Sequence, residues 1–166
     1  MSLIRVAIIE DDAPVRQILA DWIGQAEGFA RGSEHPTAES ALMALPQEAP
    51  EVVLTDVNLP GLSGIECVRR LKPLLPRTHF IMLTVYEDPD HIFDALAAGA
   101  LGYLLKRTLR DELLAALHEV LAGGSPMTSN IARKVVQSFQ PQPARTPEGD
   151  GLSPREQEVL DLLARG

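Results

Sequence analysis

Five short apolar runs along the first 105 residues constrain the fold of this chain more than any other feature. They lie at residues 4–9, 29–34, 51–55, 78–83 and 101–105, and all but the weaker second run are rich in Val, Ile and Leu. Such runs are typical of parallel strands buried on both faces. Parallel strands need long crossovers, so we expect helices at about 15–26, 37–45, 64–71, 89–98 and after 108. The pattern predicts an α/β fold with a doubly wound, five-stranded parallel sheet.

Apolar spacing and capping residues predict how individual helices begin and which faces they bury. The fifth helix is expected to begin at the capping signature Thr108-x-x-Asp111 and to place Leu114, Leu117 and Leu121 on one face. For the first helix, the residues at helical spacing are Val15, Ile18, Leu19, Trp22 and Ile23.

A break at residues 123–126, Gly-Gly-Ser-Pro, ends the alternation and suggests a domain boundary near residue 122. Residues 123–150 then form an expected linker, with a possible helix at 129–139 and a Pro-rich stretch from 140. A last helix is expected from Ser153, because Pro154 and Glu156 complete an N-terminal capping pattern. A single amphipathic helix cannot bury its own apolar stripe, so we interpret residues 151–166 as the start of a truncated, all-α second domain.

Charge and cysteine content exclude several classes of protein. The first 122 residues carry ten Lys and Arg against 18 Asp and Glu, so the entire net charge of −8 lies there. Such a surface does not attract nucleic acid by bulk electrostatics. One cysteine, Cys67, allows no intramolecular disulfide. With no signal-like or membrane-spanning run, we expect a cytoplasmic protein without a membrane partner.

Polar residues follow the predicted strands at the edge where open α/β sheets bind their ligands. They are Glu10-Asp11-Asp12, Asp56, Thr84 and Lys106. An isolated aspartate at a strand end is ordinarily a turn or helix cap. Several carboxylates gathered at one edge, however, repel one another unless a cation or proton intervenes. The pattern therefore indicates a site for a hard divalent metal, with chemistry on Asp56.

The residue types at this edge fit metal-assisted phosphoryl chemistry. Mg²⁺, or Mn²⁺, is bound by carboxylate and carbonyl oxygens, which Glu10, Asp11, Asp56 and the backbone of Asn58 can supply. A carboxylate can also attack phosphorus and form an acyl phosphate. Lys106 and the Thr84 hydroxyl would then hold the phosphoryl oxygens.

These motifs together resemble the receiver domain of two-component response regulators over about residues 3–122. The resemblance is carried by Glu10-Asp11, by the run from Asp56 through Leu59-Pro60-Gly61 to Ser63-Gly64, by Leu83-Thr84, and by Gly102-Tyr103-Leu104-Leu105-Lys106. Residues 152–160, Leu-Ser-Pro-Arg-Glu-Gln-Glu-Val-Leu, resemble the opening of a LuxR-type helix-turn-helix domain. The combination is similar to the NarL/FixJ family of transcriptional regulators, with a CheY-like, flavodoxin-like strand order.

The resemblance implies a role for each matching position. Asp56 would accept a phosphoryl group from a sensor histidine kinase, Thr84 and Lys106 would sense it, and Tyr103 would be the switch aromatic. Arg16 stands five residues after Asp11, as an arginine commonly does after the direct metal ligand in this family, with Glu10 as the water-mediated partner.

Two positions leave alternatives open at this point. The metal-binding pair could instead be Asp11-Asp12. Arg107 stands where many receivers have a cis-proline, although the NarL-like branch often lacks it.

The resemblance also implies a non-enzymatic, phosphorylation-dependent homodimer that binds DNA only through the complete C-terminal domain. Its dimer contacts would involve the fourth helix and fifth strand, or the first and fifth helices. Two other classes remain open. An aspartate-nucleophile phosphohydrolase normally has an acid two residues after the nucleophile, where this chain has Asn58. A flavodoxin-like nucleotide binder needs N–H donors in the first loop, which is acidic here.

Overall fold

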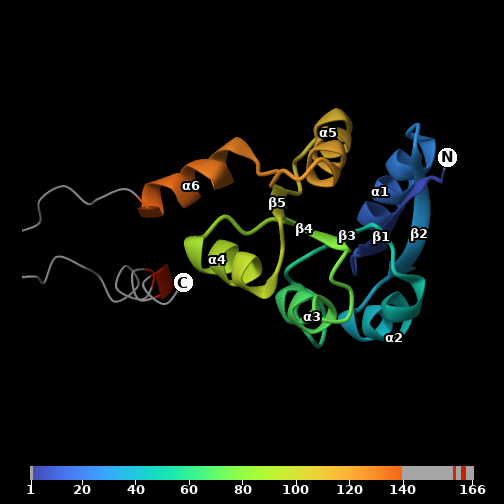
Figure 1. Cartoon of the computed structure of the whole chain (residues 1–166), viewed down its shortest axis with the longest axis horizontal. Helices are drawn as coiled ribbons and strands as arrows, with labels where there is room; N and C mark the ends of the chain where they lie inside the picture. The colour runs from blue at the N-terminus through green and yellow to red at the C-terminus, as the bar shows by residue number, and fades with distance from the viewer. Residues whose placement is uncertain (1, 140–158, 160–161, 164–166) are drawn as a thin grey trace, which may run out of the picture.

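A five-stranded, all-parallel sheet organises the protein, and its order is β2-β1-β3-β4-β5 (Figure 1). The computed structural model describes residues 2–139, 159, 162 and 163. The strands are β1 (Ile4–Ile9), β2 (Phe29–His35), β3 (Val52–Thr55), β4 (His79–Thr84) and β5 (Gly102–Leu105). The helices are α1 (Ala13–Gln25), α2 (Ala38–Glu48), α3 (Gly64–Leu71), α4 (Pro89–Ala98), α5 (Arg110–Leu121) and α6 (Ser129–Phe139). The predicted doubly wound fold is confirmed.

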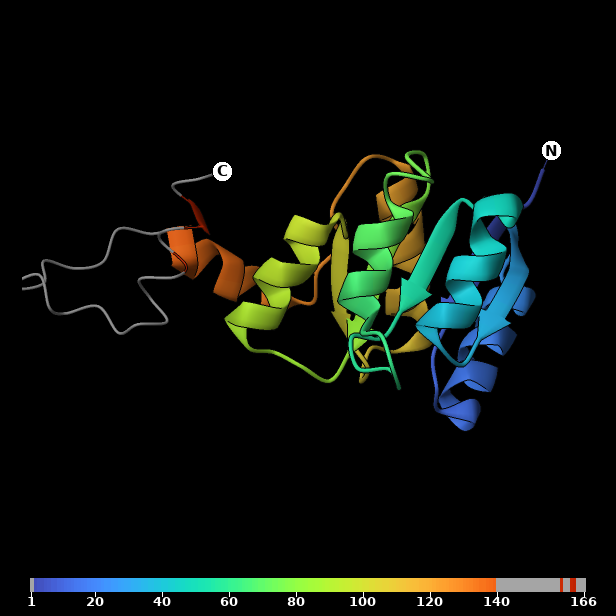
Figure 2. The same cartoon turned by 90° about the horizontal axis from the view of Figure 1, so that it is seen from below.

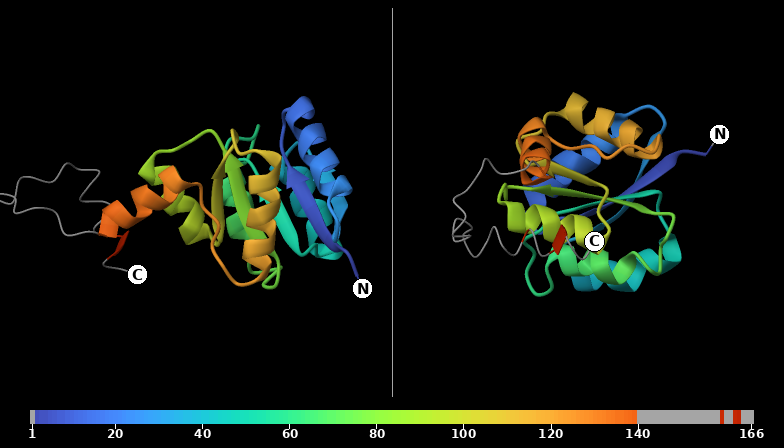
Figure 3. Two further views of the ribbon diagram at one scale, coloured as in Figure 1. Left: turned by 90° about the horizontal axis from the view of Figure 1, so that it is seen from above. Right: turned by 60° about the vertical axis from the view of Figure 1, so that its left-hand side comes forward.

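Helices cover both faces of the sheet and divide the core into two layers. Helices α1 and α5 lie on one face, and α2, α3 and α4 lie on the other (Figures 1 and 3). The layer under α1 and α5 is built on Val6, Leu54 and Ile81, whereas Ala7, Val53 and Phe80 point into the opposite layer. Successive side chains of each strand thus point into opposite core layers, as burial on both faces of the sheet requires.

Side-chain caps begin four of the helices, but the expected cap of α5 is wrong. Asp12, Thr37, Ser63 and Asp88 each accept a hydrogen bond from a backbone N–H in the first turn of α1, α2, α3 and α4. Helix α5 has Leu109 at its N-cap, without a side-chain bond. Thr108 is still part of the preceding turn, because its N–H donates to the Leu105 carbonyl at 2.9 Å.

The buried faces also differ in detail from the expected stripes. On α1 the buried side chains are Leu19, Ala20 and Ile23, while Ile18 is 48% exposed. On α5 they are Leu113, Ala116, Leu117 and Val120, and Leu114 and Leu121 lie at the margin. The apolar spacing predicted each helix but not exactly which of its side chains face the sheet. Packing against the sheet decided the rotation of the helix about its axis.

Helix α2 continues three residues past its expected end at residue 45. Pro46 lies inside the helix and removes one N–H donor, yet the chain stays helical to Glu48. The last turn is closed by the Ala49 N–H, which donates to the Leu45 carbonyl at 2.8 Å. Leu45 is fully buried, so packing holds the turn on which the proline falls.

Beyond α5, residues 126–128 lie along the free edge of β5, and α6 then packs beside α4 (Figures 1 and 2). The helix expected from Ser153 falls almost entirely outside the described residues. Among the described helices, none has the length and apolar character needed to cross a membrane.

Candidate functional site

Backbone pairing brings the carboxyl ends of four strands together at one end of the sheet, which is called the site edge. The Asp56 N–H donates to the Ile9 carbonyl at 3.1 Å, which sets the residue after β3 beside the end of β1. The Lys106 N–H donates to the Thr84 carbonyl at 2.9 Å, which sets the residue after β5 beside the end of β4. The polar residues that follow these strands therefore converge because the strands are parallel and in register.

Gly64 allows α3 to begin directly against the backbone of Asp56. A β-carbon at this position would lie 1.7 Å from the Asp56 carbonyl oxygen, a distance no side chain can occupy. The Gly64 N–H also donates to the Val57 carbonyl at 2.8 Å and closes the loop. The glycine is thus required by the close approach of two backbone segments.

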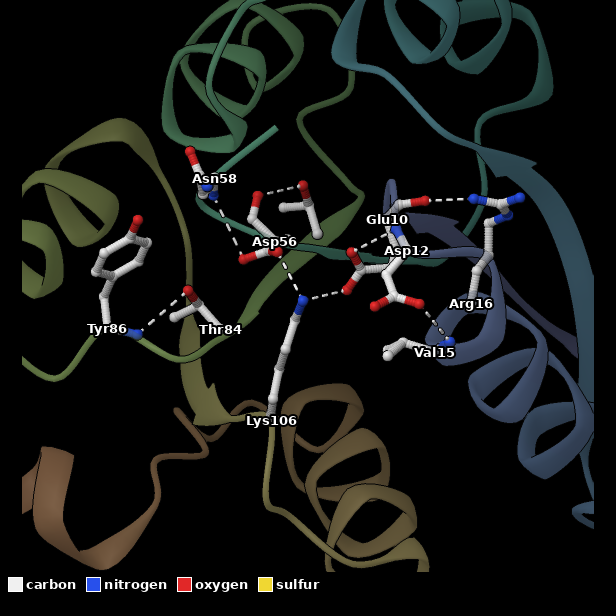
Figure 4. Close-up of polar contacts among 10 residues, drawn as sticks. Glu10, Asp12, Val15, Arg16, Asp56, Asn58, Thr84, Tyr86 and Lys106 are labelled. Carbon is white, nitrogen blue, oxygen red and sulfur yellow. Dashed lines mark hydrogen bonds and ion pairs between the residues drawn. The ribbon is translucent and has the colours of Figure 1, made fainter. Parts of the chain in front are cut away.

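The Lys106 ammonium lies between two buried carboxylates at the centre of the site (Figure 4). Its Nζ is 2.6 Å from Glu10 Oε1 and 2.7 Å from Asp56 Oδ2. The exposed fraction of the side chain is 2% for Glu10, 7% for Asp56 and 21% for Lys106. The second carboxylate oxygen of Asp56 accepts only a long bond, 3.4 Å, from the Asn58 N–H.

Burial and charge act in opposite directions on the ionisable groups of this cluster. Burial raises the pKa of the Glu10 carboxyl, and neighbouring Asp56 adds to this, although the bond from Lys106 opposes it. For Lys106, burial alone would lower the pKa, but hydrogen bonds to Asp56 and Glu10 outweigh it and raise the pKa. The lysine therefore stays charged, while one of the carboxylates it contacts is predisposed to take up a proton.

Three carboxylates of the site are close enough to share one cation. Ligand oxygens of Glu10, Asp11 and Asp56 all lie within 4.8 Å of one another, and Asp11 is exposed to solvent. This all-oxygen donor set, open on one side, fits a hard divalent ion such as Mg²⁺. Asn58 adjoins the group through its bond to Asp56.

Asp12 and Arg16 have structural contacts in the same loop. The Asp12 carboxylate accepts from the Val15 N–H at 3.3 Å and caps α1, and its own N–H donates to Glu10 Oε2 at 3.1 Å. Arg16 Nη1 donates to the Glu10 carbonyl at 2.6 Å (Figure 4). The bonds from Arg16 and from the Asp12 N–H hold Glu10 in this loop, and the bond from the Val15 N–H engages the Asp12 carboxylate in the helix cap.

Thr84 and Tyr103 lie in a second hydrogen-bonded group beside the carboxylates. Thr84 is fully buried, and its Oγ1 accepts a 3.4 Å bond from the Tyr86 N–H. Tyr103 is also fully buried, and its hydroxyl donates to the Tyr86 carbonyl at 2.9 Å. Burial, with the nearby carboxylates, raises the pKa of the Tyr103 phenol, so the hydroxyl remains a donor.

Comparison with protein families matches this arrangement to a known type of domain. A sequence model described as "Response regulator receiver domain" matches residues 6–118. The chain belongs to the response regulator receiver family. The family resemblance inferred from the five motifs is thus confirmed.

Response regulators of the LuxR type are among the similar proteins. The chain is 35% identical to the transcriptional regulatory protein UhpA of Escherichia coli (strain K12), over 99% of this chain and 78% of that protein. It is 31% identical to the response regulator GacA of Pseudomonas aeruginosa, over 98% of this chain and 76% of GacA. A LuxR-family response regulator structure from Aurantimonas sp. SI85-9A1 superposes with a TM-score of 0.77 at 28% identity, covering 82% of this chain and 97% of that one.

One feature of this receiver domain that the sequence did not reveal is the role of the loop at residues 85–88. Tyr86 binds both Thr84 and Tyr103 through its backbone, and Glu87 forms a 3.6 Å ion pair with Arg107. In the sequence, this role could have been inferred from the position of Tyr86, which stands two residues after Thr84, the last residue of β4. The described chain contains no cis peptide bond, so the bond that precedes Arg107 is trans.

Proposed function

We propose that this receiver domain accepts a phosphoryl group on Asp56 from a sensor histidine kinase and thereby controls transcription through a C-terminal DNA-binding domain. The observation that carries the proposal is the buried contact of Lys106 with both Asp56 and Glu10, beside a cluster of three carboxylates. Family membership supports it, and the relatives described above are named as a transcriptional regulator and a response regulator.

The chemistry follows from the groups at the site. A carboxylate oxygen of Asp56 attacks phosphorus, the bond from phosphorus to the histidine nitrogen of the donor breaks, and the nitrogen keeps the electron pair. The Lys106 ammonium, already 2.7 Å from Asp56, then binds an oxygen of the transferred group. The Thr84 hydroxyl, which now accepts only a long bond, turns to donate to another of these oxygens.

A divalent cation is expected to be held by Glu10, Asp11, Asp56 and the Asn58 carbonyl. When bound, Mg²⁺ or Mn²⁺ neutralises charge on the phosphoryl oxygens during transfer. We assign the direct carboxylate ligands to Asp11 and Asp56, with Glu10 acting through water. The capping bond of Asp12 supports this choice over the pair Asp11-Asp12.

Phosphorylation is expected to change dimer contacts. The rearrangement of Thr84 would spread through the Tyr86 backbone to Tyr103 and to the surface of α4 and β5. The homodimer contact is expected either on this surface, which α6 adjoins through α4, or on the surface formed by α1 and α5. DNA binding is assigned to the complete C-terminal domain, since the net charge of the receiver is strongly negative.

The two other classes have less support. A phosphohydrolase needs an acid to protonate its leaving group, and Asn58 stands at the usual position. A nucleotide binder needs phosphate-binding N–H groups in the loop after β1, where carboxylates gather instead. Multiple-turnover hydrolysis of phosphate esters would revive the first class, and bound flavin the second.

Mass spectrometry with acetyl phosphate and Mg²⁺ tests the proposal. We expect the wild-type chain to gain one phosphoryl group and Asp56→Asn to gain none. An unmodified wild type under these conditions would refute the proposal.

Two neighbouring variants test which carboxylates bind the metal. Asp12→Asn keeps a capping side chain, so phosphorylation and its dependence on Mg²⁺ should stay unchanged. Asp11→Asn should instead raise the Mg²⁺ concentration needed for phosphorylation at least about tenfold, because losing even a residue that only supports a metal ligand typically costs that much affinity. The opposite pattern would assign the site to Asp12.

A further inference from the structure

A β-bulge near the end of β2 places His35 beside the loop that carries the first carboxylates of the site. The register between β1 and β2 shifts between Val6 and Ile8, because β2 uses one residue more than β1 over this stretch. The shift sets His35 opposite Ile9, and the His35 carbonyl accepts a 2.9 Å hydrogen bond from the Glu10 N–H. Bulges of this kind often re-aim side chains next to functional sites.

The bulge is tied to the last residue of α2. A β-carbon on Gly32 would lie 3.0 Å from the Ala7 nitrogen and 2.9 Å from Glu48 Oε1, closer than side chains normally approach. The next residue, Ser33, donates its backbone N–H to the same Glu48 oxygen at 2.9 Å. The Glu48 carboxylate therefore approaches the backbone of the bulge, and glycine leaves room for it.

The His35 ring lies in a buried chain of hydrogen bonds that joins β2 to both ends of α2. Only 5% of the residue is exposed. Its Nδ1 lies 2.7 Å from the hydroxyl of Ser40, in the first turn of α2, and its Nε2 lies 2.7 Å from the hydroxyl of Ser33. The Ser33 hydroxyl also bonds to Glu48 Oε2, at the end of the helix.

The chemistry of these groups fixes the direction of every bond in the chain. The Glu48 carboxylate only accepts, so the Ser33 hydroxyl donates to it and accepts from His35 Nε2–H. Burial lowers the pKa of the His35 ring, although the Glu48 charge opposes this, so the neutral ring has one bare nitrogen. That nitrogen, Nδ1, accepts from the Ser40 hydroxyl. Both ring nitrogens are satisfied, and a fully satisfied buried network holds its members rigidly.

We propose that His35 is a positioning residue for the metal site: α2 holds its ring, and its carbonyl holds the backbone of Glu10. On the other side of the same residue, Arg16 Nη1 donates to the Glu10 carbonyl at 2.6 Å. The Glu10 backbone is thus bound through both its N–H and its carbonyl, which directs the carboxylate toward Lys106 and Asp56. The inference rests on the proposed function, because it requires that Glu10 act at a metal site.

Packing alone does not require a histidine at this position. A leucine would fill a similar volume without needing partners for two nitrogens, whose burial is costly unless both are bonded. What leucine cannot do is bind Ser33 and Ser40 and so hold the end of β2 against α2. Its effect should therefore be found in the affinity of the site for its cation.

Mn²⁺ binding tests the proposal on the chain of 166 residues, with free Mn²⁺ measured by electron paramagnetic resonance. His35→Leu should raise the Mn²⁺ dissociation constant about tenfold, since residues that orient metal ligands typically have effects of this size. Ser40→Ala removes one bond of the ring and should raise it less, whereas Ser40→Thr keeps the hydroxyl and should match the wild type. Gln47→Ala, at an exposed position of α2, is the matched control and should also leave binding unchanged. Unchanged Mn²⁺ binding in both His35→Leu and Ser40→Ala would overturn the inference.

A double-mutant cycle with Glu10→Gln distinguishes positioning from a general effect on the fold. Because His35 acts through Glu10, His35→Leu should weaken Mn²⁺ binding little further once Glu10 is replaced. An equal loss in both backgrounds would show that His35 does not act through Glu10, and the inference would be wrong.

Phosphorylation by acetyl phosphate, measured in parallel, separates this inference from the proposed function. His35→Leu should need more Mg²⁺ for half-maximal phosphorylation but should reach the wild-type rate at saturating Mg²⁺. A lower rate at saturation with an unchanged Mg²⁺ requirement would overturn the inference alone. A wild type that is not phosphorylated would instead refute the proposed function, and the inference would fall with it.

Discussion

Replacing Lys106 with methionine should destabilise the metal-free protein and increase its response to Mg²⁺. The lysine Nζ lies 2.6 Å from a carboxylate oxygen of Glu10 and 2.7 Å from one of Asp56, and both acids are almost fully buried. Methionine fills most of the space of the lysine stem but supplies no charge. The substitution therefore leaves two facing carboxylates without their cation.

The size of the effect can be worked from these contacts. With an effective dielectric constant near 20, each contact corresponds to a gross attraction of about 6 kcal/mol, which desolvation of the lysine and carboxylates largely offsets. Removing one partner of a buried ion pair typically costs about 3–5 kcal/mol. Because burial already raises the pKa of Glu10, that carboxyl can take up a proton and relieve part of the repulsion. We therefore expect a loss of about 2–3 kcal/mol in the free energy of unfolding near neutral pH.

Mg²⁺ should restore much of this loss. At the proposed metal site, the cation would compete in the wild type with the Lys106 ammonium for the same carboxylates, whereas in the variant it would have no competitor. A ligand present at a hundred times its dissociation constant adds about 2.7 kcal/mol to stability. The increase in unfolding free energy on adding Mg²⁺ should consequently be larger for Lys106→Met than for the wild type.

Urea unfolding at constant ionic strength, with and without MgCl₂, measures both effects. Arg77→Met is a suitable control because this exposed arginine lies between α3 and β4. It is therefore near the amino end of β4, whereas the site is at the carboxyl ends of the strands. It should change neither the stability nor the response to Mg²⁺. The reasoning is refuted if Lys106→Met is as stable as the wild type without metal, or if Mg²⁺ stabilises both proteins equally.

Three further predictions concern packing and ionisation. Gly64→Ala should lower the free energy of unfolding by about 3 kcal/mol, because the new β-carbon would meet the Asp56 carbonyl. In the control Gly24→Ala, the β-carbon would meet only a flexible arginine side chain, so the variant should be neutral or slightly stabilised. A lower urea midpoint for Gly24→Ala than for Gly64→Ala would contradict this. Burial raises the pKa of the Cys67 thiol to about 12, so a disulfide reagent at pH 8 should modify it in urea but not in the folded protein. Burial lowers the pKa of His79 below its ordinary value of 6.5, so near that pH the unfolded chain binds a proton that the folded chain does not. The free energy of unfolding should therefore fall as the pH drops below about 6.5. In urea titrations at several pH values, His79→Gln should make the unfolding free energy depend less steeply on pH.

Local sequence patterns were sufficient for the fold and for the edge of the sheet where the polar residues gather. Apolar runs such as residues 51–55 indicate buried parallel strands, and parallel strands end at one edge whatever the details of their packing. Helix rotation and caps were predicted less well. Ile18 and Thr108 fit a helical stripe and a capping signature, but contacts with the sheet and the turn before α5 decided otherwise.

What the sequence determined by itself is the alternation of strands and helices and the set of residues at the site edge, because these depend on residue type and spacing; the family and the strand order followed from the resemblance that these residues carry. Only the tertiary structure decided how those residues contact one another. It placed the Lys106 ammonium between Glu10 and Asp56, engaged Asp12 as a helix cap, and joined Tyr86 to Tyr103. It also packed α6 against α4. The physical reason is that such contacts depend on distances between residues far apart in the chain, and only the packed sheet and its helices define those distances.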